Sequence, residues 1–115
     1  MQYAYVVTWK APVTGREMKA LEYGAEVQTF WRKFAAEGKC SEPELFFFPQ
    51  GHGMWLVKGD FQTLEELWLR DESQHLLAKA FWLLEDFGYD FVRTGDAADQ
   101  YMTFFADVGK ELAFT

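Results

Sequence analysis

Few side chains in this sequence could serve as acids, bases, nucleophiles or metal ligands. The chain has two histidines, His52 and His75, and one cysteine, Cys40. The histidines do not form an HxxxH pair and no CxxC pair occurs, so the usual zinc spacings are missing. Glu42 and Glu44 could add oxygen ligands, but they complete no recognisable set. We therefore expect no metal site and no cofactor.

Cys40 is the one candidate nucleophile. A nucleophilic cysteine needs a base and an electropositive setting. Lys39 is adjacent, but no catalytic motif surrounds the cysteine. We interpret Cys40 as an incidental thiol in a loop or partly buried. A single cysteine cannot form an intrachain disulfide, which fits a reducing cytoplasm.

Each histidine allows a functional and a structural interpretation. His52 lies in Gln50–Gly53, where it could line the mouth of a pocket, although a turn residue is the simpler interpretation. His75 shares one helical face with the residues 4, 7 and 11 positions further on, which are Lys79, Trp82 and Asp86. That face is either a pocket or haem-facing surface with His75 as ligand or acid/base, or a solvated face with Trp82 tucked under a neighbouring element or at a dimer contact. We favour the solvated face.

Two charges stand in an otherwise apolar stretch, Asp90 and Arg93. They could orient a polar ligand, or they could form cross-strand pairs with Lys58 or Glu44. Structural pairing is the simpler interpretation, because exposed ion pairs are common and weak.

Aromatic residues could form the walls of an apolar cleft, or they could only fill a core or a dimer contact. The candidates are Tyr3, Tyr5, Trp9 and Trp55. A binding site places a few polar groups within an apolar concavity. We therefore expect Arg93 and at least one histidine to line the principal cavity between sheet and helices, with Trp9 and Trp55 as walls.

The charge balance argues against several classes of partner. Eighteen acids against eleven bases give a net charge of −7, and the basic residues form no cluster. Nucleic acids and anionic membranes would be repelled. No stretch approaches 18 uncharged apolar residues, and the first ten residues lack the pattern of a signal peptide. We expect a cytoplasmic protein without nucleic-acid or membrane partners.

The first half of the chain predicts a strand, a helix and a hairpin. Residues 3–9 are β-branched and aromatic, which is typical of a strand. Thr14 and Glu17 form a capping box that predicts a helix, ending at Gly38. Its apolar residues recur every three or four positions: Ala20, Tyr23, Val27, Phe30, Trp31 and Phe34. Residues 44–49 and 54–58 predict two strands joined by the loop 50–53.

The second helical region has a break in its apolar pattern. A capping box at 63–66 predicts a helix whose apolar face includes Leu64, Leu67 and Trp68. A second apolar face lies nearly opposite at 100° per residue, and comprises Leu76, Leu77, Ala80, Phe81, Leu84 and Phe87. One straight helix cannot bury both faces in one core. We predict a break at 70–73, with Ser73 capping the second piece, which ends at Gly88.

The last part predicts a strand over 89–94 and a helix capped by Asp96. The apolar positions of that helix are Tyr101, Phe105, Val108 and Leu112. The resulting order, β-α-β-β-α-β plus a terminal helix, predicts a single α+β domain over 1–115. It is the ferredoxin-like arrangement, a four-stranded antiparallel sheet with its helices on one face.

The sheet predicts a partner for its other face. The first three strands are apolar on both faces, whereas a sheet with one wet face alternates. The open face has a footprint of roughly 400 Å². Twelve Phe, five Tyr and five Trp are many rings for 115 residues, and aromatics are enriched at interfaces. We predict a homodimer through this face.

The element order, the length and the two-sided strands resemble the dimeric α/β-barrel superfamily of small ferredoxin-like proteins. That superfamily includes cofactor-free and haem-degrading monooxygenases, isomerases and ligand-sensing domains. The haem-degrading branch carries an Asn on its first strand, and residues 3–9 contain none. The resemblance implies the fold and does not select an activity.

Our leading hypothesis is a cleft between sheet and helices that binds a small apolar or aromatic molecule, with cofactor-free oxygenase or isomerase chemistry as an extension. The alternative is a non-catalytic module whose aromatics only build the dimer, and haem binding ranks below both. A cavity of about 300 Å³ or more lined by His or Arg favours the first hypothesis, and a filled interior favours the second.

Overall fold

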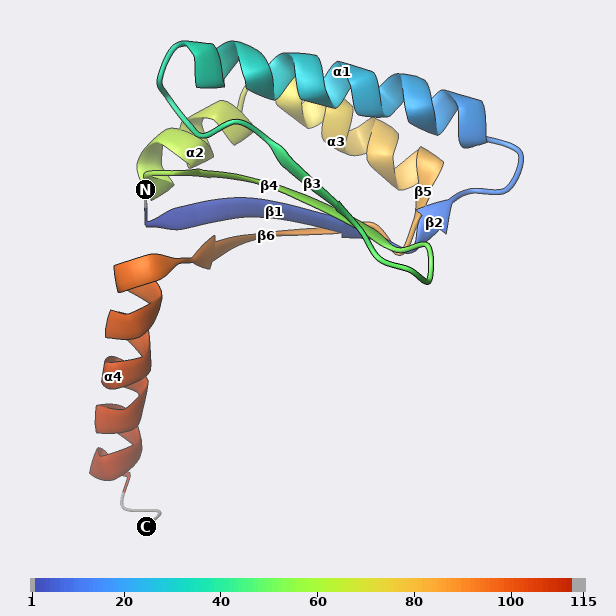
Figure 1. The fold of residues 1–115 in the computed structure, drawn as a ribbon. Coiled ribbons are helices and arrows are strands. Elements are labelled where there is room, and N and C mark those ends of the chain that lie inside the picture. The colour runs from blue at the N-terminus through green and yellow to red at the C-terminus, as the bar shows by residue number, and fades with distance from the viewer. Residues whose placement is uncertain (1, 113–115) are drawn as a thin grey trace.

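A computed structural model describes residues 2–112 as an antiparallel sheet with helices on one face and a C-terminal helix (Figure 1). The strands are β1 (Tyr3–Trp9), β2 (Ala11–Pro12), β3 (Glu44–Phe47), β4 (Gly53–Gly59), β5 (Leu84–Glu85) and β6 (Gly88–Arg93). The helices are α1 (Glu17–Ala36), α2 (Phe61–Trp68), α3 (Asp71–Leu83) and α4 (Gly95–Glu111).

The main sheet has the strand order β3-β4-β1-β6, and each neighbouring pair is antiparallel. Figure 1 shows α1 and α3 side by side over one face of this sheet. This confirms the predicted ferredoxin-like α+β fold. None of the described helices is long and apolar enough to cross a membrane.

The predicted break in the second helical region is confirmed. α2 ends at Trp68 and α3 begins at Asp71, with Arg70 extended at φ −62° and ψ 146°. The break lets Leu67 and Leu76 both reach the same core, although their faces lie nearly opposite on one helix. Ser73 does not cap α3. It lies inside the first turn and is buried.

The end of α3 differs from the prediction. The helix stops at Leu83, and Leu84–Glu85 pairs with Ala11–Pro12 as a two-stranded ribbon. Asp86 then adopts a left-handed backbone at φ 50°. The apolar pattern continues through this turn because Leu84 and Phe87 still pack on the core. Periodicity alone therefore does not indicate that the helix ends and a short strand begins. Phe81 is 58% exposed and is not part of the buried face.

Neither predicted capping box caps its helix, because both helices begin at other residues than predicted. α1 begins at Glu17 after Arg16, and α2 begins at Phe61 after Asp60, without side-chain caps. The Glu17 carboxylate instead accepts a hydrogen bond from the Gly15 N–H at 2.8 Å. α4 follows Thr94 rather than Asp96.

The core is a layer of rings between α1 and the sheet. The Tyr5 ring lies 5.5 Å from Trp31 and 5.6 Å from Trp55, centroid to centroid. Trp31 also contacts Phe30, which contacts Phe34. All five side chains are almost fully buried. Burial raises the pKa of the Tyr5 phenol well above its ordinary value, so this hydroxyl stays neutral.

The open face of the sheet is apolar at its centre and polar at its margins. Register places Val6 beside Leu56, and Phe46 beside Met54, on the face opposite the helices. The same face carries Thr8, Glu44, Lys58 and Asp90. The predicted apolar surface is therefore smaller than the whole face. An apolar centre with a polar rim is the usual composition of an interface.

α4 extends away from the rest of the molecule (Figure 1), and none of its residues is buried. Its first turn is fixed by Gln2, whose carbonyl accepts from the Thr94 N–H and whose side-chain Oε1 accepts from the Ala97 N–H. The Arg93 guanidinium lies 4.3 Å from the centroid of the Tyr101 ring.

Gly53 allows the close approach of Trp9. The two residues are paired across β1 and β4, and a Cβ added at Gly53 would overlap the Trp9 indole ring. We expect Gly53→Ala to lower the free energy of unfolding by about 1–3 kcal/mol through overpacking. Gly88→Ala is the control, because its Cβ would meet only Thr8 Oγ1 at 3.7 Å. Chemical denaturation of both variants at one protein concentration checks this, and equal stabilities would contradict it.

Cys40 is buried in the core, with its Sγ 4.0 Å from the Trp31 carbonyl oxygen. Desolvation, reinforced by Glu42, raises the pKa of this thiol to about 11. Since each pKa unit changes the thiolate fraction tenfold, native Cys40 should react with a disulfide reagent at pH 8 at least about tenfold more slowly than in the unfolded chain. Reaction rates measured with and without guanidinium chloride check this. Equal rates would mean that the thiol is accessible.

Candidate functional site

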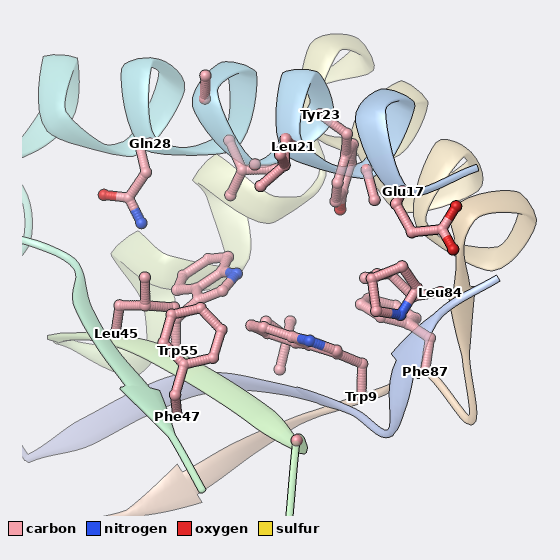
Figure 2. A pocket seen from close by; sticks show the side chains of 17 residues that line it. Trp9, Glu17, Leu21, Tyr23, Gln28, Leu45, Phe47, Trp55, Leu84 and Phe87 are labelled. Atoms are coloured by element: carbon pink, nitrogen blue, oxygen red, sulfur yellow. The ribbon is translucent and has the colours of Figure 1, made fainter. Parts of the chain in front are cut away.

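The cavity between the sheet and the helices lies under the N-terminal half of α1, at the end of the sheet that carries Trp9 (Figure 2). Its volume is about 440 Å³. α1, β1, the β3–β4 hairpin and the β2–β5 ribbon all contribute to its wall.

The roof of the cavity is formed by small residues on α1. Ala20, Gly24 and Val27 follow the helical repeat of three and four, so they share the face toward the sheet. A Cβ built at Gly24 would meet no other atom within 4 Å. A glycine inside a helix costs about 1 kcal/mol relative to alanine. Its effect here is to leave the space below α1 open.

The floor and sides are aromatic. Val7 and Trp9 alternate with outward residues on β1, and Trp55 lies opposite Val7 on β4. Phe47 packs edge-to-face on Trp9, with ring centroids 6.4 Å apart. Phe87 closes the side next to the β2–β5 ribbon, together with Pro12 and Leu84.

Three polar side chains from the described part of the chain border this apolar space. Figure 2 shows Glu17 at one end and Gln28 at the other, with Tyr23 reaching down from α1 between them. Burial, reinforced by Glu26, raises the pKa of the Tyr23 phenol far above its usual value. The hydroxyl therefore stays protonated and can donate or accept a hydrogen bond.

Among the described residues, no lysine, arginine or histidine lines the cavity. An anionic ligand would lose its hydration there and gain no counter-charge. The lining therefore suits an uncharged ring system better than a carboxylate or phosphate.

The predicted site residues separate into two groups. Trp9 and Trp55 both line the cavity, as expected for its walls. The expectation that Arg93 and a histidine line it is wrong. His52 is exposed at the tip of the β3–β4 hairpin, where its carbonyl accepts from the Phe48 N–H, and only its neighbour Gly51 borders the cavity.

His75 lies on the outer surface, in an open groove between α1 and α3. Glu26, Glu72 and Lys79 share this groove, and Lys79 Nζ lies 3.0 Å from Glu26 Oε2. Trp82 is 71% exposed, so no described element of the chain covers it. This is the solvated face that the sequence favoured.

Arg93 lies at the α2 end of the sheet, opposite Tyr3, with its guanidinium over Tyr101. Within residues 2–112 neither Arg93 nor Asp90 forms a salt bridge with Lys58 or Glu44. The predicted cross-strand pairs are therefore replaced by a cation–π contact for the arginine. Asp90 accepts a hydrogen bond from the Phe91 N–H.

The α1 side of the cavity does not follow from the sequence analysis. The apolar pattern predicts Tyr23 only as a core residue and indicates no role for Gly24 or Gln28. A glycine in the middle of a long amphipathic helix was the available signal, because its propensity cost calls for a reason. The described residues contain no group of three or more His, Cys, Asp or Glu that could hold a metal ion.

Comparisons with known proteins identify the fold and no closer relationship. No family model and no curated protein matches the sequence. Among solved structures, a conserved protein from Bacteroides thetaiotaomicron, described as a possible oxidoreductase, has a TM-score of 0.63 at 12% identity, over 81% of this chain and 98% of that one. An antibiotic biosynthesis monooxygenase gives 0.62 at 14% identity, over 80% and 98%.

A third similar structure is an ethd family protein from Bacillus halodurans. It has a TM-score of 0.60 at 10% identity, and the match covers 83% of this chain and 100% of that one. Identities this low support the fold alone. The chain therefore has the ferredoxin-like α+β fold of these proteins, as the resemblance to the dimeric α/β-barrel superfamily implied.

Proposed function

We propose that the protein binds a small, flat, uncharged aromatic molecule in the cavity between α1 and the sheet. One observation carries this proposal, which is an open space of about 440 Å³ bounded by Trp9, Trp55, Phe47 and Phe87. Ligand sites in proteins are commonly apolar concavities of roughly 300–1,000 Å³ with a few polar groups. The volume meets the criterion set from the sequence, while the polar groups are Tyr23, Gln28 and Glu17 instead of His or Arg.

The energetics favour a molecule of about two fused rings. An aromatic group of this kind removes roughly 150–250 Å² from water. At about 25 cal/mol per Å² this contributes on the order of 5 kcal/mol before association costs. Stacking on Trp9 or Trp55 and a hydrogen bond to Tyr23 would add to this. We expect dissociation constants between micromolar and millimolar for simple probes.

A second candidate is chemistry on the bound molecule, as a cofactor-free monooxygenase or isomerase. Among the described residues, Glu17 is the one carboxylate that lines the cavity, and it could accept a proton from a bound phenol. Two similar structures are described as a possible oxidoreductase and an antibiotic biosynthesis monooxygenase. Oxygen uptake measured with 2-naphthol, for the wild type and Glu17→Gln, tests this candidate. If uptake equals the protein-free rate, the monooxygenase candidate is contradicted and only the binding proposal remains.

Haem binding and a non-catalytic module are the other two hypotheses. Haem binding has little support, because His75 lies in the outer groove and His52 is at the hairpin tip, outside the cavity lining. The non-catalytic alternative predicts that the aromatic residues serve only packing. Under that alternative the cavity would bind none of the probes described below.

We also propose that the protein is a homodimer through the open face of its sheet. The apolar centre of that face, around Val6 and Leu56, supports this arrangement. A second copy related by a two-fold axis would bring two such centres together. The small-molecule proposal does not depend on the dimer.

Filling the cavity from Gly24 tests the binding proposal. We expect Gly24→Leu to weaken the binding of 2-naphthol at least about tenfold, which is about 1.4 kcal/mol. The same change should leave stability equal or raise it by up to about 1 kcal/mol, because leucine is a better helix former than glycine. Titration followed by quenching of tryptophan fluorescence measures the affinity.

Two comparisons make this test specific. Ala36→Leu, at the exposed end of α1, is the matched control and should bind like the wild type. Replacing 2-naphthol by the anion 2-naphthoate should weaken binding, because no cation lines the cavity among the described residues. Unchanged affinity in Gly24→Leu, or no binding by the wild type, would refute this site.

A further inference from the structure

α4 is strongly amphipathic, although no element among residues 2–112 covers its apolar face. At 100° per residue its apolar side chains occupy an arc of about 160°. They are Ala97, Ala98, Tyr101, Met102, Phe104, Phe105, Val108 and Leu112. The opposite face carries the acids and the other polar residues. A helix with this pattern buries its apolar face against something.

The apolar face of α4 is nevertheless exposed. Phe104 is 61% exposed, Phe105 62% and Met102 64%. Since one aromatic side chain presents roughly 150–250 Å², the exposed apolar surface of α4 is on the order of 500 Å². A contiguous apolar patch of this size is as large as the largest patch on a typical soluble monomer, and such patches are often interaction sites.

The position of α4 relates this face to the open side of the sheet. In Figure 1, α1 and α3 cover one side of the sheet, and α4 leaves the end of β6 toward the opposite side. The contacts of Gln2 with Thr94 and Ala97, and of Arg93 with Tyr101, set this direction. The helix has 17 residues, or about 25 Å of length. Two packed sheets are only about 10 Å apart.

We propose that α4 is a reciprocal clamp, in which α4 of each copy packs its apolar face against the flank of a second copy seated on the open sheet face. The inference rests on the proposed homodimer and adds the element that completes its interface. A helix of about 25 Å that starts at one sheet extends past the sheet of a partner about 10 Å away.

The area supports a second copy as the occupant. A stable interface buries about 800 Å² on each partner. The open sheet face provides roughly 400 Å², which is too little by itself. The surface of α4, on the order of 500 Å², brings the total to the required size. Neither α4 nor the sheet face alone therefore provides the area that a stable interface buries.

The charges of α4 argue against an anionic membrane as the occupant. Its polar face carries Asp96, Asp99, Asp107 and Glu111 against Lys110. Helices that lie on anionic lipid are rich in lysine and arginine. Repulsion of these carboxylates by lipid phosphates would oppose docking there.

The test compares Phe105→Glu with Thr103→Glu, on the apolar and polar faces of the same helix. Light scattering at micromolar concentration should give twice the chain mass of 13.4 kDa for the wild type and for Thr103→Glu. Phe105→Glu should weaken the dimer at least about a hundredfold and run as a monomer. Because no residue of α4 is buried, circular dichroism should show that Phe105→Glu stays folded.

Photo-cross-linking identifies what α4 contacts. With benzoylphenylalanine at position 105, irradiation of purified protein should produce a covalent dimer. Cross-linking within one chain would overturn the proposal, because α4 would then fold back on its own sheet. A dimeric Phe105→Glu without a dimer cross-link would overturn the clamp and leave the sheet-face dimer standing. A monomeric wild type would overturn both, and binding of the wild type to anionic vesicles would favour the membrane instead.

Discussion

The contact of the Tyr5 ring with Trp31 and Trp55 sets the distance between α1 and the sheet. These three rings contact one another in one buried cluster. Because the rings lie between α1 and the strands β1 and β4, their size keeps the helix at a distance from the sheet. In the C-terminal half of α1 the gap is filled by Phe30, Trp31 and Phe34. In the N-terminal half Tyr23 fills part of the gap, and Ala20 and Gly24 are too short to fill the rest.

The cavity follows directly from this unequal filling. A helix that packs on a sheet keeps its axis nearly straight, so it cannot sink onto the sheet at one end while large rings hold the other. The space left under Ala20 and Gly24 is then bordered by whatever the sheet presents there, which is Trp9 and Trp55. Packing at one end of α1 thus creates the cavity at the other.

The sequence specified the fold through its apolar periods, and specified the site only in part. Three apolar patterns are strong signals, because each indicates a face that must be buried. They are the period of two in the strands, the apolar face of α1, and the change of apolar face between Leu67 and Leu76. The ends of helices were predicted less well. The pairing of Leu84–Glu85 with Ala11–Pro12 depends on chain segments far apart in the sequence, which local capping patterns do not report.

The same distinction explains the site. Trp9 and Trp55 could be anticipated because alternation on a strand shows which aromatic residues share a face. Arg93 shares a face with Tyr3 and Tyr5 as well, but it lies at the far end of the sheet. The position of a residue along its strand decides at which end of the sheet its side chain lies. Periodicity shows only which face of the sheet a side chain is on.

The ribbon of β2 and β5 has a consequence for how the cavity opens. It has two residues on each strand, flanked by hydrogen bonds from Lys10 to Glu85 and from Val13 to Leu83. A ribbon so short has little stability of its own, whereas the rings beneath α1 are fixed by the whole core. The wall formed by Pro12 and Leu84 should therefore separate by local unfolding at a lower free energy than the four-stranded sheet. If the proposed ligand binds, its passage through this wall would not require the four-stranded sheet to unpair, so ligand exchange would be separate from global unfolding.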